Sequence, residues 1–149
     1  MSERLRRDAR AIWDAAVAAV RPEPLVRRAI ADLAGVLNAA PRILVFGAGK
    51  AGAAMAVAVE HALGDQLDRV EGIVNVPADA VRPLQKIRLH AARPPATNFP
   101  TAEGVAGAEE MLRLARTAGP DDVALCLLSG GGSALLPCLL YTSPSPRDS

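Results

Sequence analysis

The chain has 149 residues, of which 50% are hydrophobic and only 3% are aromatic. This length allows one domain with an aliphatic core of its own. The 17 basic and 16 acidic side chains leave a net charge of +1, which argues against a nucleic-acid-binding surface or a basic membrane patch. No apolar run is long enough to cross a membrane, and no signal-peptide pattern is visible. We therefore expect a cytoplasmic protein with no nucleic-acid or membrane partner.

Apolar residues at helical spacing predict two N-terminal helices, over residues 3–20 and about 26–37. The proline-rich segment 21–24 separates them. The short, uniformly apolar run 42–46 indicates a buried parallel strand. Residues 48–63 then return to a helical pattern.

Strands are predicted over residues 70–76, 87–90 and 123–128, and a helix from Thr101 to about residue 118. Alternation of strands and helices is typical of an α/β fold with a mostly parallel sheet and helices on both faces. The two N-terminal helices precede this unit.

The two cysteines predict neither a disulfide nor a metal site. Cys126 lies within the predicted strand 123–128, so we expect a reduced thiol in the core. Cys138 begins the segment 138–149, which breaks the pattern of the chain. No protein metal site is predicted.

A glycine-rich turn, FGAGKAG over residues 46–52, follows the first predicted strand. Backbone N–H groups at such a turn suit an anion. Gly47 and Gly49 match the form of a dinucleotide fingerprint, but the acidic residue expected at the end of the next strand is missing. Lys50 opposes the helix dipole, and a bound phosphate or carboxylate would neutralise both. We predict an anion site here.

A second turn follows the strand 123–128 and contains three consecutive glycines. Three glycines are costly in backbone entropy, yet they let a ligand approach the backbone closely. The carboxyl edge of a parallel strand is where ligands bind in open α/β sheets. We predict phosphate binding by Ser129, Gly130, Gly131, Gly132 and Ser133, with Ser133 also placed to cap a helix.

Three further residues are candidates for the same edge. His90 ends the third predicted strand, and Arg93 and Asn98 lie in the proline-rich loop 93–100. Arg93 and Asn98 have the chemistry to hold a carboxylate or hydroxyl group, or else they stabilise the loop.

The last twelve residues, 138–149, match a conceptual translation of a sequencing-library adapter. We expect residues 1–137 to be a truncated α/β domain and residues 138–149 to be a disordered, non-native tail. The alternative is a genuine disordered C-terminus.

The segments ILVFGAGKAGAAM (43–55) and LLSGGGSALL (127–136) together resemble the N-terminal domain of the class II glycerate kinases. This family is also labelled MOFRL or hydroxypyruvate reductase, and the resemblance covers residues 5–137. It implies a Rossmann-like domain, a second C-terminal domain and an active site between them. It further implies a kinase that transfers phosphate from ATP, with Mg²⁺, to an alcohol group of D-glycerate, with 2-phosphoglycerate favoured as the product.

The resemblance assigns Lys50 to substrate binding or catalysis and residues 129–133 to the active-site cleft. One departure is that many members have a His-Pro-x-Pro element where this chain has Arg93-Pro94-Pro95-Ala96. This departure suggests a subfamily with different substrate contacts.

Two other functions stay open. A phosphosugar-binding module of the isomerase type has a turn similar to residues 46–52 and needs no ATP. An NAD(P)-dependent hydroxypyruvate reductase is the third reading. The 149 residues alone are expected to be inactive, because half of the cleft would be missing.

Overall fold

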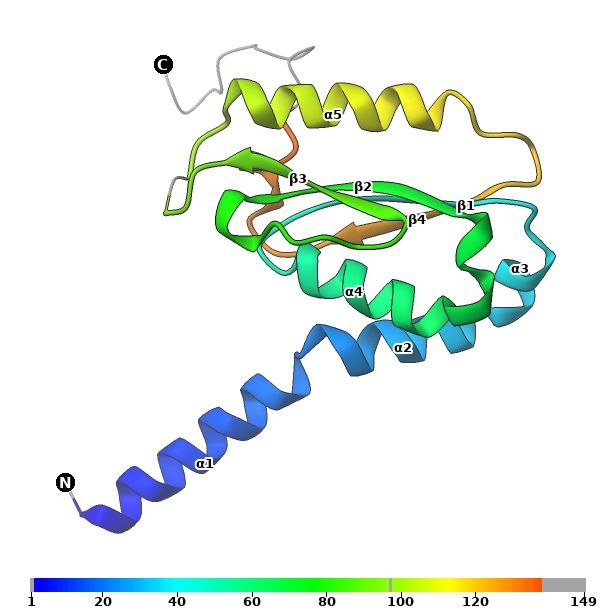
Figure 1. Cartoon of the computed structure of the whole chain (residues 1–149). Coiled ribbons are helices and arrows are strands. Elements are labelled where there is room, and N and C mark those ends of the chain that lie inside the picture. The colour runs from blue at the N-terminus through cyan, green and yellow to red at the C-terminus, as the bar shows by residue number, and fades with distance from the viewer. Residues whose placement is uncertain (1, 97, 138–149) are drawn as a thin grey trace, which may run out of the picture.

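The computed structural model describes residues 2–96 and 98–137. The predictions for Cys138 and for the tail 138–149 lie outside these residues. The strands form one parallel sheet in the order β3-β2-β1-β4 (Figure 1). They are β1 (Ile43–Ala48), β2 (Val70–Pro77), β3 (Ile87–Arg93) and β4 (Val123–Leu128). The α/β prediction is confirmed.

Helices cover both faces of the sheet (Figure 1). One face is packed by α4, with α2 outside it, and the other by α5. The helices are α1 (Glu3–Ala19), α2 (Pro22–Asp32), α3 (Ala34–Ala39), α4 (Gly52–Leu63) and α5 (Ala102–Ala115), with short 3₁₀ turns η1 (Gly64–Arg69), η2 (Ala78–Ala80) and η3 (Gly132–Ala134). The single helix predicted over 26–37 is two helices, α2 and α3, because the helix breaks at Leu33, close to the weak helix former Gly35.

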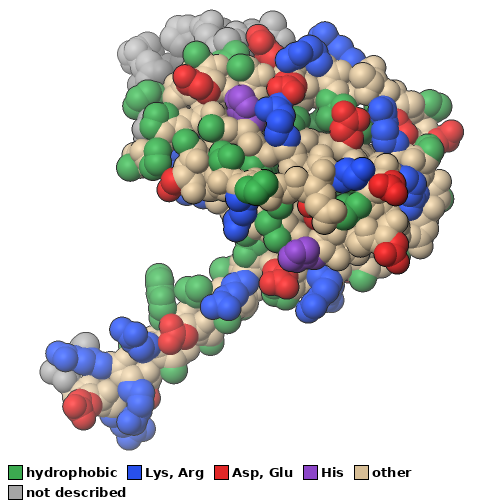
Figure 2. Space-filling view, viewed as in Figure 1, with side chains coloured by type: hydrophobic (Ala, Val, Ile, Leu, Met, Phe, Trp, Pro, Cys, Tyr) green, Lys and Arg blue, Asp and Glu red, His purple; other side chains and the backbone are tan. Residues whose placement is uncertain are grey.

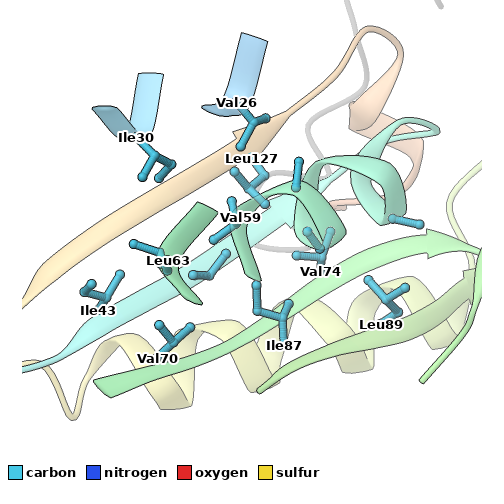
Figure 3. Packing of buried hydrophobic residues seen from close by; sticks show 14 of the residues in the cluster. Val26, Ile30, Ile43, Val59, Leu63, Val70, Val74, Ile87, Leu89 and Leu127 are labelled. Atoms are coloured by element: carbon cyan, nitrogen blue, oxygen red, sulfur yellow. The ribbon is translucent and has the colours of Figure 1, made fainter. Parts of the chain in front are cut away.

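The core between the sheet and α4 is aliphatic, as the composition predicts (Figure 3). Alternate residues of each strand point to α4, because side chains of a strand have a period of two. The labelled core residues are Val26, Ile30, Ile43, Val59, Leu63, Val70, Val74, Ile87, Leu89 and Leu127.

The opposite face of β4 is open among the described residues, and this corrects the prediction for Cys126. Its thiol is free and exposed rather than buried, and Leu128 on the same face is 62% exposed. The register places Cys126 opposite Phe46, on the face that α5 covers mainly over β2 and β3. A uniformly apolar run predicts burial on both faces, but β4 is an edge strand, and the described residues cover only one of its faces.

Helix α1 projects away from the rest of the molecule (Figures 1 and 2). It has no buried residue, and Trp13 is 69% exposed. The large apolar side chains that predicted this helix are therefore exposed, and arginines lie between them in the sequence. None of the described helices is long and apolar enough to span a membrane.

A charged pair joins the segments that lead into β1 and β4. Arg42 donates from Nε and Nη2 to Asp122 Oδ2 at 3.1 and 3.0 Å, and the same oxygen accepts from the Gly119 backbone N–H at 2.8 Å. The Gly119 hydrogen bond first, and the Arg42 guanidinium with it, hold the pKa of the Asp122 carboxyl below its usual range.

We expect Asp122→Asn to lower the melting temperature at pH 7 and to lower it less at about pH 3, where the contribution of the carboxylate is reduced. A depressed folded-state pKa contributes stability above the unfolded value of about 3.9, and this is lost as the pH falls through the folded-state pKa. Thermal unfolding at both pH values checks this. The control is Asp121→Asn, on the exposed neighbouring residue. An equal loss for Asp122→Asn at both pH values would contradict the role of the charge.

Candidate functional site

The strand order creates a switch point at the carboxyl edge of the sheet. The chain passes from β1 outward through β2 to β3, and then crosses back to place β4 on the other side of β1. In open α/β sheets, ligands bind at this reversal, outside the carboxyl ends of the strands. Both glycine-rich turns lie there, because one follows β1 and the other follows β4.

The two turns interlock. Ser129 Oγ accepts a hydrogen bond from the Ala51 backbone N–H at 3.2 Å, and Ser129 N donates to Ala48 O at 3.3 Å. Gly49 has a φ of +138°, and a Cβ on it would overlap Ser129 Oγ. A Cβ on Gly47 would overlap the Leu127 carbonyl oxygen. Glycine at both positions therefore lets the two turns approach each other closely.

The first turn offers fewer free N–H groups than the sequence suggests. Gly49 N donates to Asn75 O at 3.2 Å, Gly52 N donates to Gly49 O at 3.0 Å, and Ala51 N is used by Ser129. The side chain of Lys50 is exposed, and no carboxylate of the described residues lies within ion-pair distance of it. The turn thus offers an ammonium group; binding of phosphate by Gly47 and Gly49 stays a prediction.

The second turn is more open. Gly130 and Gly131 are exposed, and no backbone carbonyl among the described residues accepts from their N–H groups. Gly131 has a φ of +74° and lies at the N-cap of η3. Ser133 is the middle residue of η3 rather than its cap, and its side chain lies outside what the structure describes. Open N–H donors at a sheet edge suit a phosphate.

A cavity of about 320 Å³ lies beside Lys50, and Arg93 and Asn98 line it. Arg93 is only 4% exposed. Its Nη1 donates to Asn98 Oδ1 at 3.0 Å, while its buried Nε has no acceptor. The cavity also has Asp79 in its wall, together with Pro77, Ala80, Pro95 and Ala96. The structure therefore brings three of the sequence candidates together.

His90 lies elsewhere. Its side chain points to the face of the sheet that α5 covers, where Nε2 lies 2.8 Å from Glu103 O at the start of that helix. His90 does not line the Lys50 cavity. Hydrogen bonds from the backbone N–H of Glu103 and from Thr101, and then the charge of His90, lower the pKa of the Glu103 carboxyl. The contacts of His90 are those of a residue that fixes α5 on the sheet.

Asn75 is the residue that the sequence reasoning missed. Its side chain is fully buried, and Nδ2 donates to Gly104 O at 3.0 Å and to Leu135 O at 2.7 Å. Its backbone oxygen accepts from Gly49 N. Asn75 thus joins the first turn, α5 and the segment after the second turn. The available signal was an amide inside the apolar run Val74-Asn75-Val76.

We expect Asn75→Ala to lower the free energy of unfolding by about 2–4 kcal/mol, because it removes two hydrogen bonds to backbone carbonyl oxygens and opens a cavity. Urea denaturation followed by circular dichroism measures this loss. Asn38→Ala is the control, since exposed Asn38 accepts from Gln66 on the surface. A loss as small as that of the control would mean that Asn75 does not hold these elements together.

Comparison with known proteins gives consistent matches. A family model described as "Domain of unknown function (DUF4147)" matches residues 8–142. The glycerate kinase of Rattus norvegicus is 32% identical over 89% of this chain, and that of Homo sapiens 31% identical over 89%. A protein of Agrobacterium vitis named "Putative hydroxypyruvate reductase" is 37% identical over 85%.

The fold has a solved counterpart. The crystal structure of a glycerate kinase from Thermotoga maritima matches 90% of this chain with a TM-score of 0.66 and 28% identity. This chain spans 30% of that protein and 29% of the length of the rat and human enzymes.

Proposed function

The chain belongs to the DUF4147 family, the N-terminal domain of the class II glycerate kinases, and from this membership we propose that the full-length protein phosphorylates D-glycerate with ATP. The product we favour is 2-phosphoglycerate. The observation that supports this proposal is the pair of interlocked turns at the switch point, with an exposed ammonium group on one and open N–H donors on the other. Phosphoryl transfer depends mainly on positioning and charge neutralisation, which such groups provide.

The residues present fit a nucleotide phosphate. Gly130 and Gly131 would hold its oxygens through backbone N–H groups, and the positive φ of Gly131 lets the turn curve around them. Lys50 would lie next to the transferred group and offset negative charge as it develops. ATP supplies the phosphoryl group when it is bound. The chain's own residues would hold these hydrogen-bond donors and the Lys50 ammonium group in position around the phosphate.

For Mg²⁺ we assign no ligand to this part of the protein. Within residues 2–96 and 98–137, no group of three or more His, Cys, Asp and Glu side chains could hold a metal ion. We propose that Mg²⁺ enters with the nucleotide phosphates and that its protein ligands come from other parts of the full-length chain.

A second domain completes the proposal. The relatives are more than three times as long as the segment that matches this chain, and we propose that their additional length corresponds to a domain that closes the cleft over the two turns. The 149 residues alone are then expected to be inactive, since only one wall of the site would be present.

The test is an assay of the full-length protein with ATP, Mg²⁺ and D-glycerate. ADP release is followed by a coupled assay, and ³¹P NMR identifies the phosphorylated carbon. We expect glycerate-dependent ADP release and 2-phosphoglycerate as the product. Absence of glycerate-dependent turnover in a folded, ATP-binding protein would overturn the proposal.

The reductase name of the Agrobacterium vitis relative favours hydroxypyruvate reduction over the phosphosugar-binding module as the alternative function. The end of β2 argues against it, because the position that suits a ribose-binding acid is near Asn75, a buried amide with its donors already used. Oxidation of NADH by the same preparation with hydroxypyruvate, without ATP, would favour the reductase.

A further inference from the structure

We infer that the cavity beside Lys50 is the subsite for the carboxylate of a small 2-hydroxy acid, and that Arg93 is its principal ligand. This inference rests on the proposed function, which it deepens by saying which group of the substrate is recognised and where. Its basis is a buried guanidinium that the described residues leave incompletely partnered.

Among the described residues, the Nε of Arg93 has no hydrogen-bond partner. Its Nη1 is held by Asn98 Oδ1 at 3.0 Å, and its Nε is buried without an acceptor. In a guanidinium, Nη1 is on the side of Cδ, so the Nε–H and one Nη2–H point together in the other direction. These two N–H groups form a fork that matches the two oxygens of a carboxylate. Asn98 therefore fixes the Nη1 side of the guanidinium, and a carboxylate would engage the buried Nε once the Arg93 side chain turned toward the cavity.

The charges of the cavity favour an anion. No carboxylate of the described residues forms an ion pair with Arg93 or Lys50. A buried cation without a counter-charge is costly, and an incoming carboxylate offsets this cost. Asp79 is the one acidic group in the described wall, and it is exposed. Its oxygens can accept from a substrate hydroxyl, which favours a hydroxy acid over a simple carboxylate.

The place of Lys50 explains how one substrate reaches both parts of the site. Lys50 follows β1, which lies between β2 and β4 in the sheet. On one side of Lys50 is the cavity formed after β2 and β3, and on the other is the Gly130–Gly131 turn after β4. A substrate with its carboxylate on Arg93 would direct a hydroxyl past Lys50 toward the phosphate turn.

The experiment uses the full-length protein and measures D-glycerate binding by calorimetry without ATP. We expect Arg93→Met to weaken binding by about 10- to 100-fold, since hydrogen bonds to a charged group are lost. Arg93→Lys should also weaken it, because an ammonium cannot form the fork. The control is Arg88→Met, on the same strand but paired with Glu110 outside the cavity. In the kinase assay, Arg93→Met should raise KM for glycerate and leave KM for ATP unchanged.

A further variant protects the test against misfolding of Arg93→Met. Asn98→Ala removes only the exposed partner of Nη1, and we expect it to weaken glycerate binding about 3- to 10-fold, since one hydrogen bond to a charged group is lost. Unchanged binding in folded Arg93 and Asn98 variants would overturn the inference. So would binding of inorganic phosphate, with no binding of D-glycerate, that depends on Arg93. Arg93-dependent binding in a protein without kinase activity would support the subsite and reject only the proposed reaction.

Discussion

Replacing Lys50 by alanine in the full-length protein is expected to lower kcat by about 100- to 1000-fold and to leave the melting temperature unchanged. The side chain is exposed and has no ion-pair partner among the described residues, so its removal costs no packing or charge pairing. A group that offsets charge as it develops in a phosphoryl transfer is worth this much in rate. Steady-state kinetics with ATP and D-glycerate measure the loss, and thermal unfolding measures the stability.

The matched control is Lys86→Ala, which removes the other lysine of the chain. Lys86 pairs with Asp68 at 3.4 Å, far along the sequence from either glycine-rich turn. We expect the Lys86→Ala protein to keep the kcat of the unsubstituted protein. Near-normal kcat in a folded Lys50→Ala protein would reject the catalytic assignment while leaving the fold as described.

Replacing Gly49 by alanine is expected to lower the free energy of unfolding by about 3 kcal/mol or more. Two penalties combine: a φ of +138° that L residues rarely adopt, and a Cβ that overlaps Ser129 Oγ. The loss should appear as a lower midpoint in urea denaturation. Because the overlap lies between the two turns, activity should fall as well.

A double variant separates the two penalties. Gly49→Ala combined with Ser129→Gly removes the overlap with Oγ but keeps the backbone strain and loses the Ala51 N–Ser129 Oγ hydrogen bond, so only part of the lost stability should return. Gly35→Ala is the control, since a Cβ there meets nothing within 4 Å and alanine favours the helix. If the double variant regains nothing, the contact between Gly49 and Ser129 does not determine the spacing of the turns.

The sequence predicts the sheet well because each strand is a short apolar run bounded by turn residues. The strand 123–128 has the bounds that the structure gives β4, and Thr101 caps α5 by accepting from Gly104 N. Periodicity could not show that α2 ends at Asp32, because the apolar spacing continues across the break at Leu33. It also could not show which face of β4 lacks a cover, since burial of Cys126 depends on the place of α5.

The site was predicted in parts rather than as an arrangement. Lys50, Arg93 and Asn98 were found as separate candidates, and only the fold shows that they line one cavity. His90 was misleading because strand alternation points it to α5, a direction that depends on the register of β3. Asn75 could not be identified from the sequence, because its partners, Gly104 O and Leu135 O, are backbone atoms distant in sequence.

The exposed face and edge of β4 also have a consequence while the protein is being synthesised. β4 ends the described sheet with an apolar face open and with one edge unpaired among the described strands. Parallel sheets are normally covered on both faces, and an open edge recruits other strands. In a protein as long as the relatives, this strand leaves the ribosome well before most of the chain, at about 5–20 residues per second. A nascent domain with this apolar face and strand edge open is prone to associate with other chains.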